Sequence, residues 1–284
     1  MKKNNSGDIT AKPQKRKRRF VILVILIALG IYVIVGFCNT GLETTHYVYR
    51  SSKLPKEFDG YKIVLISDLH HKNFGHNQSE LIRKIKAAKP DMIVLTGDIV
   101  DENHTDMTSI ENFIMGISRI APAYYVNGNH ELDKDAGYQY ERLKALLQEY
   151  GITNLNNDTY EVKKKQESIT LTGVSYCGEN IVNKLTYADE SKFNILLYHC
   201  SDAFGKISSY GYDIMLSGHA HGGIIRIPFV GGILGNNRDF FPKYAGGVYI
   251  ENQCTLFSSR GLGDAEVPRF YNPPEVVVIT LKSS

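Results

Sequence analysis

The sequence predicts an α/β (α+β) protein preceded by one membrane-spanning helix. In the first half of the chain, short apolar runs alternate with amphipathic stretches, whereas the second half is rich in strand-like segments. A stretch of 18 residues near the N-terminus carries no charge. With 284 residues, of which 43% are hydrophobic, the chain can bury one large core or two modest ones, which excludes disorder for most of it.

The uncharged stretch, FVILVILIALGIYVIVGF at 20–37, spans roughly 27 Å as a helix, close to the hydrocarbon thickness of a bilayer. Residues 1–19 contain eight Lys or Arg and one Asp, or +7 in a chain whose formal net charge is +3. Because basic flanks stay in the cytoplasm, we expect a single-pass cell-membrane protein with a cytoplasmic N-terminus and an extracytoplasmic domain. A cleaved export signal and a buried core helix are the alternatives.

We divide the chain into four parts. They are a basic cytoplasmic tail (1–19), a transmembrane helix (20–38), a linker (39–60) and one domain (61–284). The tail orients the helix and attracts anionic membrane lipids. Because the rest of the chain is mildly acidic, no nucleic-acid partner is expected.

The domain begins with strands at YKIVLIS, DMIVLTGD and PAYYVNGNH, separated by helical patterns in SELIRKIKAAK and from about Ile110 onward. This β-α-β order predicts a sheet with helices outside it. After a helical YERLKALLQEY, strands are expected at TYEVKK, SITLTGV, FNILLYH, DIMLSGH and EVVVITL.

Metal-binding side chains lie at the C-terminal ends of five of these strands. At that edge of an α/β sheet loops converge and ligands bind. Carboxylates can bridge cations, imidazoles suit Mn, Fe or Zn, and an amide oxygen adds a neutral ligand. Two cations about 3.5–4 Å apart clamp a phosphoryl group and turn a bound water into hydroxide, so the pattern predicts hydrolysis of a phosphate ester. The residues are Asp68, His70, Asp98, Asn129, His130, His199, His219 and His221.

The motifs SDLH (67–70), GDIVD (97–101), GNHE (128–131), YHC around His199 and GHAH (218–221) resemble those of the calcineurin-like metallophosphoesterases in order and spacing. The resemblance covers roughly 60–281 and implies a four-layer αββα sandwich with two divalent metal ions. It implies one metal held by Asp68, His70, Asp98 and His221, and a second held by Asp98, Asn129, His199 and His219. His130 matches the histidine that contacts the phosphate, so His130 and Asp98 are the candidate catalytic residues.

Two further stretches, GHAHGGIIRIP and SRGLGDAEVPRFYNPPEVVVITL, look like the membrane-associated branch of that family, which includes YkuE-type and YaeI-type phosphodiesterases. Ile224 departs from the Gln that often follows the glycines in that branch. Arg226 and Arg260 are candidates to bind the substrate anion, with a structural salt bridge as the alternative for each. Gly218, Gly222 and Gly223 permit the close approaches that let both imidazoles of GHAH face the metals.

We therefore expect a membrane-anchored, metal-dependent phosphohydrolase, namely a phosphodiesterase or pyrophosphatase acting on a lipid- or envelope-linked phosphate ester through metal-bound hydroxide. The lipid link follows from the anchor, which concentrates the enzyme at the membrane. The alternatives are a phosphomonoesterase or nucleotide hydrolase, and a non-catalytic scaffold stabilised by metal. Asp101 and Glu131 are expected to orient ligands. A Cys177–Cys254 disulfide and the oligomeric state are left open.

Overall fold

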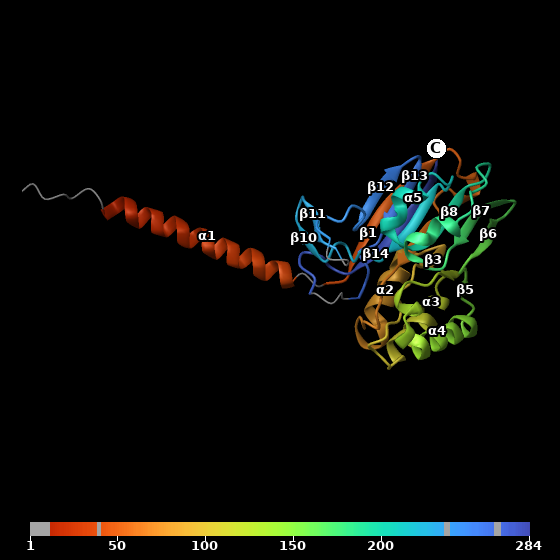
Figure 1. Cartoon of the computed structure of the whole chain (residues 1–284), viewed down its shortest axis with the longest axis horizontal. Helices are drawn as coiled ribbons and strands as arrows, with labels where there is room; N and C mark the ends of the chain where they lie inside the picture. Colours follow the sequence, from red (N-terminus) through yellow and green to blue (C-terminus); the bar gives the residue numbers. More distant parts are fainter. Residues whose placement is uncertain (1–11, 39–40, 236–238, 264–267) are drawn as a thin grey trace, which may run out of the picture.

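The computed structural model describes residues 12–38, 41–235, 239–263 and 268–284. Two six-stranded sheets form the centre of the domain, and the N-terminal helix α1 (Lys12–Cys38) extends away from it (Figure 1). By length and composition, residues Lys17–Phe37 of α1 suit a membrane span, and equally a signal sequence.

The first sheet has the strand order β1-β14-β2-β3-β4-β5. Strands β2 to β5 run parallel, and β14 is antiparallel to β2. The strands are β1 (Glu43–Ser51), β2 (Lys62–Ile66), β3 (Met92–Leu95), β4 (Ala123–Tyr125), β5 (Thr153–Asn154) and β14 (Glu275–Ser283), and the connecting helices are α2 (Ser79–Ala88), α3 (Thr108–Ser118) and α4 (Gly137–Glu149).

The second sheet has the order β12-β13-β9-β8-β7-β6, with parallel pairing from β13 to β7 and an antiparallel strand at each edge. A separate hairpin is formed by β10 and β11. The elements are β6 (Asp158–Lys164), β7 (Glu167–Gly173), β8 (Asn194–Cys200), α5 (Phe204–Ile207), β9 (Ile214–Gly218), β10 (Ile225–Ile227), β11 (Gly231–Leu234), β12 (Gly247–Glu251) and β13 (Cys254–Ser258). Short 3-10 turns are η1 (Lys56–Phe58), η2 (His76–Gln78), η3 (His130–Leu132), η4 (Lys134–Ala136), η5 (Gly178–Asn183) and η6 (Ser201–Ala203).

Three buried apolar clusters separate four layers of structure. The first lies between helices α2 to α4 and the first sheet, the second between the two sheets, and the third between the second sheet and the helical segments η5 and α5. In α2 the buried residues Leu81, Ile85 and Ala88 recur at helical spacing, so one face of the helix covers the sheet. The expected αββα sandwich is confirmed.

The segment 43–51, which we placed in the linker, is a strand of the first sheet. Strand β1 pairs in parallel with β14 along its whole length, from Glu43 opposite Glu275 to Ser51 opposite Ser283. Its side chains alternate in exposure because one face lies on the sandwich, where Tyr47 and Tyr49 pack against the core between the sheets. Strands β10 to β13, which have three to five residues each, were not expected from the sequence either.

The three cysteines whose side chains the structure describes are free thiols. Cys177 and Cys254, whose pairing the sequence left open, therefore form no disulfide in this structure. Burial raises the pKa of Cys254 to about 12, so its thiol stays protonated.

Candidate metal centre

The two sheets bring the predicted ligands together at one edge. Asp68 follows β2, Asp98 follows β3 and Asn129 follows β4, all in the first sheet. His199 lies in β8 and His219 directly follows β9, both in the second sheet. Because these five strands are parallel within their sheets, their C-terminal ends place the side chains in one region.

The backbone at this edge is held in a conformation that ordinary residues seldom adopt. Five of the seven expected ligands have a positive φ, although none is glycine. Such strain persists only where surrounding structure imposes it, and it gathers at functional sites. The five are Asp68 (φ 53°), His70 (47°), Asp98 (52°), His219 (72°) and His221 (46°).

The first group of candidate ligands is Asp68, His70 and His221, whose ligand atoms all lie within 4.8 Å of one another. His221 Nε2 is 3.6 Å from Asp68 Oδ1. His70 Nε2 lies 3.8 Å from Asp98 Oδ2 and is a buried nitrogen with no hydrogen-bond partner. An orphaned buried imidazole nitrogen facing carboxylates fits a metal ligand.

The second group is Asp98, His199 and His219, which satisfies the same distance limit. His199 Nε2 lies 3.0 Å from Asp98 Oδ2, 3.1 Å from Asn129 Oδ1 and 3.1 Å from His219 Nδ1. Nitrogen and oxygen atoms thus crowd around one point, as ligands of one cation do. Asp98 belongs to this group and also faces His70, so its carboxylate is placed between the two groups.

Burial and neighbouring charges shift the pKa values of the histidines in this cluster in opposite directions. Burial disfavours the charged form of His199, but the Asp98 carboxylate outweighs burial and raises the pKa of His199 to about 9. Burial and the nearby His199 lower the pKa of His219 to about 4. Burial opposes ionisation of Asp98 as well, yet His199 holds the pKa of that carboxyl well below its usual range.

His199 also has a fixed orientation. Its Nδ1 lies 2.7 Å from the backbone oxygen of Thr96, which is the acceptor that an Nδ1–H would need. This bond leaves Nε2 as the nitrogen that faces Asp98 and Asn129, and backbone carbonyls commonly set metal-binding histidines in this way.

His130 lies beside both groups but is held differently. Its backbone N–H donates to Asp98 Oδ1 at 2.9 Å, and its Nδ1 lies 2.8 Å from Glu102 Oε2. About a third of the side chain is exposed, so solvent or a substrate can reach the ring. Sequence reasoning missed Glu102, whose only signal is that it directly follows the motif at 97–101.

Glu131 and Asp101 contact the ligand loops, as expected. The buried Glu131 carboxylate accepts N–H bonds from Asp98 at 2.9 Å and from Gly128 at 2.6 Å, and so ties the loop after β3 to the loop after β4. Asp101 Oδ2 lies 3.7 Å from His70 Nδ1, and Asp101 Oδ1 lies 2.7 Å from His104 Nδ1.

The glycine of GHAH that precedes His219 is required by close approach. A Cβ on Gly218 would overlap Ser67 Oγ and the Asp68 carboxylate, which reaches over Gly218 to accept the His219 N–H at 3.0 Å. Gly218 therefore provides the space that the Asp68 side chain occupies.

The two candidate substrate arginines already have partners within the chain. Arg260 Nη2 lies 3.0 Å from Glu43 Oε2 and 3.1 Å from Glu275 Oε1. Arg226 Nη1 donates to the backbone oxygen of Gly222 at 2.6 Å. Another arginine, the buried Arg269, comes closer to the ligands, with Nη2 3.4 Å from His221 Nδ1.

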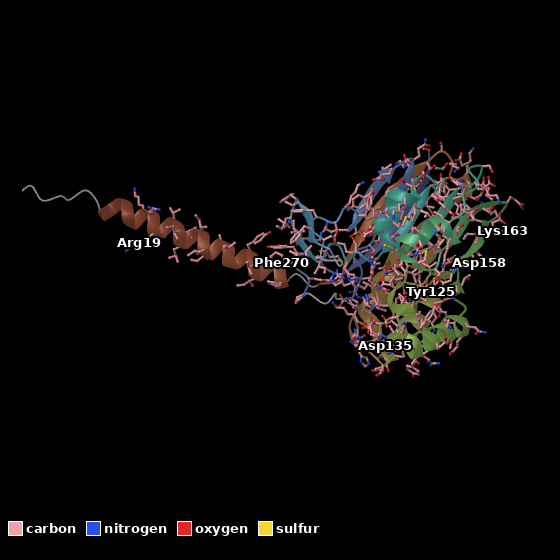
Figure 2. All side chains as sticks on the ribbon, viewed as in Figure 1. Arg19, Tyr125, Asp135, Asp158, Lys163 and Phe270 are labelled. Atoms are coloured by element: carbon pink, nitrogen blue, oxygen red, sulfur yellow. The ribbon has the colours of Figure 1, made fainter. Side chains whose placement is uncertain are left out.

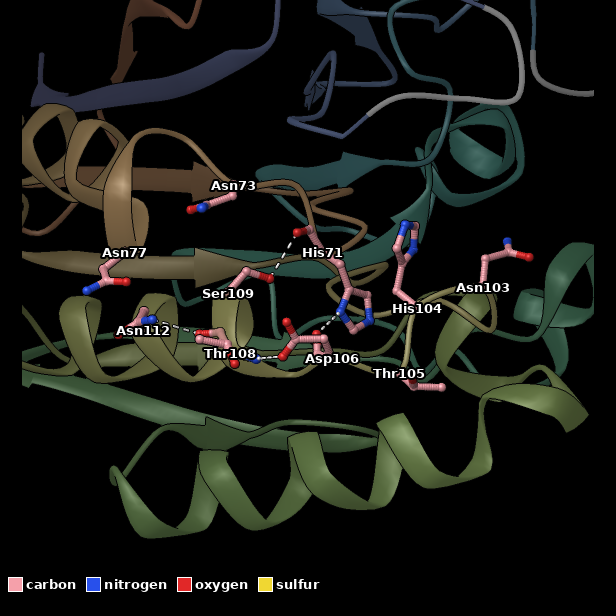
Figure 3. A pocket seen from close by; sticks show the side chains of 10 residues that line it. All are labelled: His71, Asn73, Asn77, Asn103, His104, Thr105, Asp106, Thr108, Ser109 and Asn112. Carbon is pink, nitrogen blue, oxygen red and sulfur yellow. Dashed lines mark hydrogen bonds between the residues drawn. The ribbon is translucent and has the colours of Figure 1, made fainter.

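A polar pocket of about 480 Å³ lies beside the loops after β2 and β3 (Figure 3). His71 and His104 stack at its wall with ring centroids 5.3 Å apart, and His71 Nδ1 lies 3.2 Å from the backbone oxygen of Asp106. His104 also contacts Asp101, which lies in the same loop.

Two clusters of hard and borderline ligands with the Asp98 carboxylate between them, and an accessible histidine beside them, define a metal-dependent hydrolase of phosphate esters. A family model described as "Calcineurin-like phosphoesterase" matches residues 61–223. The chain therefore belongs to the calcineurin-like phosphoesterases, whose dinuclear divalent metal centre its Asp and His groups are able to hold. The predicted family and enzyme class are confirmed.

The curated relatives include metallophosphoesterase YkuE of Bacillus subtilis (strain 168), which is 32% identical over 254 residues and 86% of each chain. Phosphodiesterase YaeI of Escherichia coli (strain K12) is 25% identical over 225 residues, or 78% of this chain and 82% of the relative. Among solved structures, the phosphopantetheinyl hydrolase of Mycobacterium tuberculosis matches 72% of this chain and 91% of its own, with a TM-score of 0.44 and 12% identity.

Proposed function

We propose that this protein is a membrane-anchored phosphodiesterase or pyrophosphatase whose substrate is a lipid- or envelope-linked phosphate ester. The observation that carries the hydrolytic part is the position of Asp98 between two groups of candidate ligands. The membrane part rests on α1 and on the basic tail before it, and the diester specificity on the similarity to a relative named phosphodiesterase YaeI.

We assign one cation to Asp68, His70, Asp98 and His221, and the other to Asp98, Asn129, His199 and His219. When bound, the two cations polarise the phosphoryl group and activate water at neutral pH. Glu131 holds the two loops that carry Asp98 and Asn129 at a fixed separation through their backbone N–H groups.

His130 supplies the proton in this proposal. Because Glu102 holds its Nδ1, Nε2 is the nitrogen that can pass a proton to the leaving oxygen as the ester bond breaks. Arg226 and Arg260 remain proposed anion contacts. Arg226 already donates to Gly222, and Arg260 to Glu43 and Glu275. Either arginine would therefore bind the substrate anion through its remaining N–H groups.

The test uses the full chain in detergent, assayed on bis-p-nitrophenyl phosphate and p-nitrophenyl phosphate with added Mn²⁺ and after chelation. We expect metal-dependent cleavage that favours the diester and is lost in Asp98→Asn. Asp158→Asn is the matched control, since Asp158 is exposed on β6 (Figure 2) and is expected to retain full activity. Hydrolysis that survives chelation would sink the proposal, and a preference for the monoester would favour a phosphomonoesterase.

A further inference from the structure

The β10–β11 hairpin and the segment after it carry an exposed apolar surface. We call the five side chains Ile227, Phe229, Val230, Phe240 and Phe241 the hairpin surface. Phe229, at the turn between the strands, is fully exposed, and Phe240 and Phe241 are 74% and 64% exposed. Single exposed apolar residues are ordinary, but a group confined to one small element marks an interaction site.

These side chains belong to one connected piece of structure. Phe240 bridges to Leu234 of β11, and the Phe241 N–H donates to the Ile233 backbone oxygen at 2.9 Å. The backbone at 240–241 therefore pairs with β11 on its free side. The hairpin is a two-stranded sheet separate from the two sheets of the sandwich, and its five apolar side chains are left exposed.

The hairpin lies at the end of the domain from which α1 extends (Figure 1), and contacts through Phe270 join the two. β10 bridges through Ile225 to Phe270, which is labelled beside the end of α1 in Figure 2. The Phe270 ring centroid lies 5.0 Å from that of Phe37 and 6.1 Å from that of Tyr32, both on α1. The glycine at position 36 makes room for this ring, since a Cβ there would overlap it.

When α1 crosses the bilayer, these contacts place residues 270–271 at the depth of its last turns. The Tyr271 N–H donates to the Gly36 backbone oxygen at 2.9 Å, and its hydroxyl donates to the Tyr32 backbone oxygen at 2.9 Å. The candidate span ends at Phe37, and Tyr32 lies five residues earlier, about 7.5 Å further along the helix at ~1.5 Å per residue. A residue bonded to Tyr32 therefore lies inside the end of the span, just below the interfacial layer where aromatic rings are favoured.

We propose that the hairpin surface inserts into the same leaflet from which α1 emerges, so that the membrane is its partner. This inference rests on the anchoring proposed above. β10 begins four residues after His221, so a hairpin seated in the bilayer holds the metal centre close to the lipid headgroups. Two points of attachment, α1 and the hairpin, then fix the tilt of the domain, which one helix alone does not do.

The test exploits the absence of tryptophan from the chain. Phe229→Trp introduces a single fluorophore into the hairpin surface, and Val230→Trp is a second variant should the first fold poorly. Tyr138→Trp, exposed on α4, is the matched control. Each full-length variant is reconstituted into phosphatidylcholine vesicles, with or without bromine on the acyl chains, and flotation reports whether the chain is anchored.

We expect the tryptophan at 229 or 230 to emit at shorter wavelength and to lose most of its emission in brominated vesicles, while the tryptophan at 138 does neither. Flotation without quenching at 229 and 230 would overturn the hairpin proposal and leave the anchor standing. A blue shift without bromine quenching would indicate a protein partner or a second copy, and would also overturn it. A chain that fails to float would overturn anchor and hairpin together. The readout needs no turnover, so it is independent of the hydrolytic proposal.

Discussion

Glu102 shows how one carboxylate can decide what a neighbouring histidine does. Its Oε2 is the partner of His130 Nδ1, and it therefore orients the ring that we assign to protonation of the leaving oxygen. Removing the carboxylate while keeping the shape of the side chain separates this orienting role from packing. Partners of this kind commonly contribute about 10–100-fold to activity.

We predict that Glu102→Gln slows hydrolysis of a dialkyl phosphodiester by about 10–100-fold, with a smaller effect on bis-p-nitrophenyl phosphate, because p-nitrophenolate leaves without being protonated. The measurement is kcat on both substrates, and Glu141→Gln, exposed on α4, serves as the unaffected control. Equal slowing on both substrates would mean that Glu102 acts on the fold of the loop instead of on the proton.

His199 makes metal binding depend on pH. Without metal, the Asp98 carboxylate raises its pKa to about 9, whereas a histidine must be neutral to coordinate a cation. Below about pH 9, Mn²⁺ binding therefore releases a proton from His199. We predict that the affinity for Mn²⁺ falls up to ~10-fold for each unit by which the pH is lowered. Titration calorimetry at pH 6, 7 and 8 measures this, and an affinity that is flat over that range would contradict it.

At the scale of elements, Arg260 joins β1 to β14. Glu43 and Glu275 are opposite each other in the two strands, and the same Arg260 nitrogen contacts both. Glu275 is almost fully buried, so removing the guanidinium would leave a buried carboxylate without its cationic partner.

We predict that Arg260→Met destabilises the protein by about 3–5 kcal/mol. The expected loss in Tm is about 2–4 °C per kcal/mol for a domain of this size, measured by thermal unfolding. The double variant Arg260→Met/Glu275→Gln should recover part of that loss, because it also removes the unpaired charge. A raised KM at unchanged Tm would show that Arg260 serves as the proposed anion contact and not as a structural ion pair.

Strand β1 sets where the folded domain begins. Because β1 pairs with β14 over nine residues, a chain shortened to 52–284 loses an edge strand and exposes β14. We predict that a chain of 41–284 unfolds cooperatively and cleaves bis-p-nitrophenyl phosphate as the full chain does. The chain of 52–284 is expected to have a lower Tm, and equal Tm values for the two would show that β1 is dispensable.

On the scale of the whole molecule, the metal ligands and the contacts with α1 come from different segments of the domain. The ligands come from the C-terminal ends of strands in both sheets, so the metal centre needs the two sheets packed together. Contacts with α1 come from the 270–271 segment and, through it, from the hairpin. We therefore expect loss of α1 to weaken flotation with vesicles while sparing cleavage of a soluble diester.

The sequence by itself predicted the helix-covered sheet and the apolar helix, and its motifs, through the family resemblance, implied the αββα sandwich and the candidate ligands. These depend on local patterns: alternation of apolar residues, and short motifs whose chemistry survives any particular packing. It did not reveal β1, whose exposed polar residues resemble a linker until β14, more than 200 residues away in the chain, pairs with them.

Only the tertiary structure decided what the charged and aromatic side chains contact. Arg260 was a plausible anion binder in isolation, and its position between Glu43 and Glu275 depends on how β1 and β14 align. Glu102 became the partner of His130 because the loops after β3 and β4 meet. The hairpin surface became visible because its apolar residues stay outside the sandwich, beside the end of α1. Long-range pairing sets each of these contacts, and no local pattern encodes it.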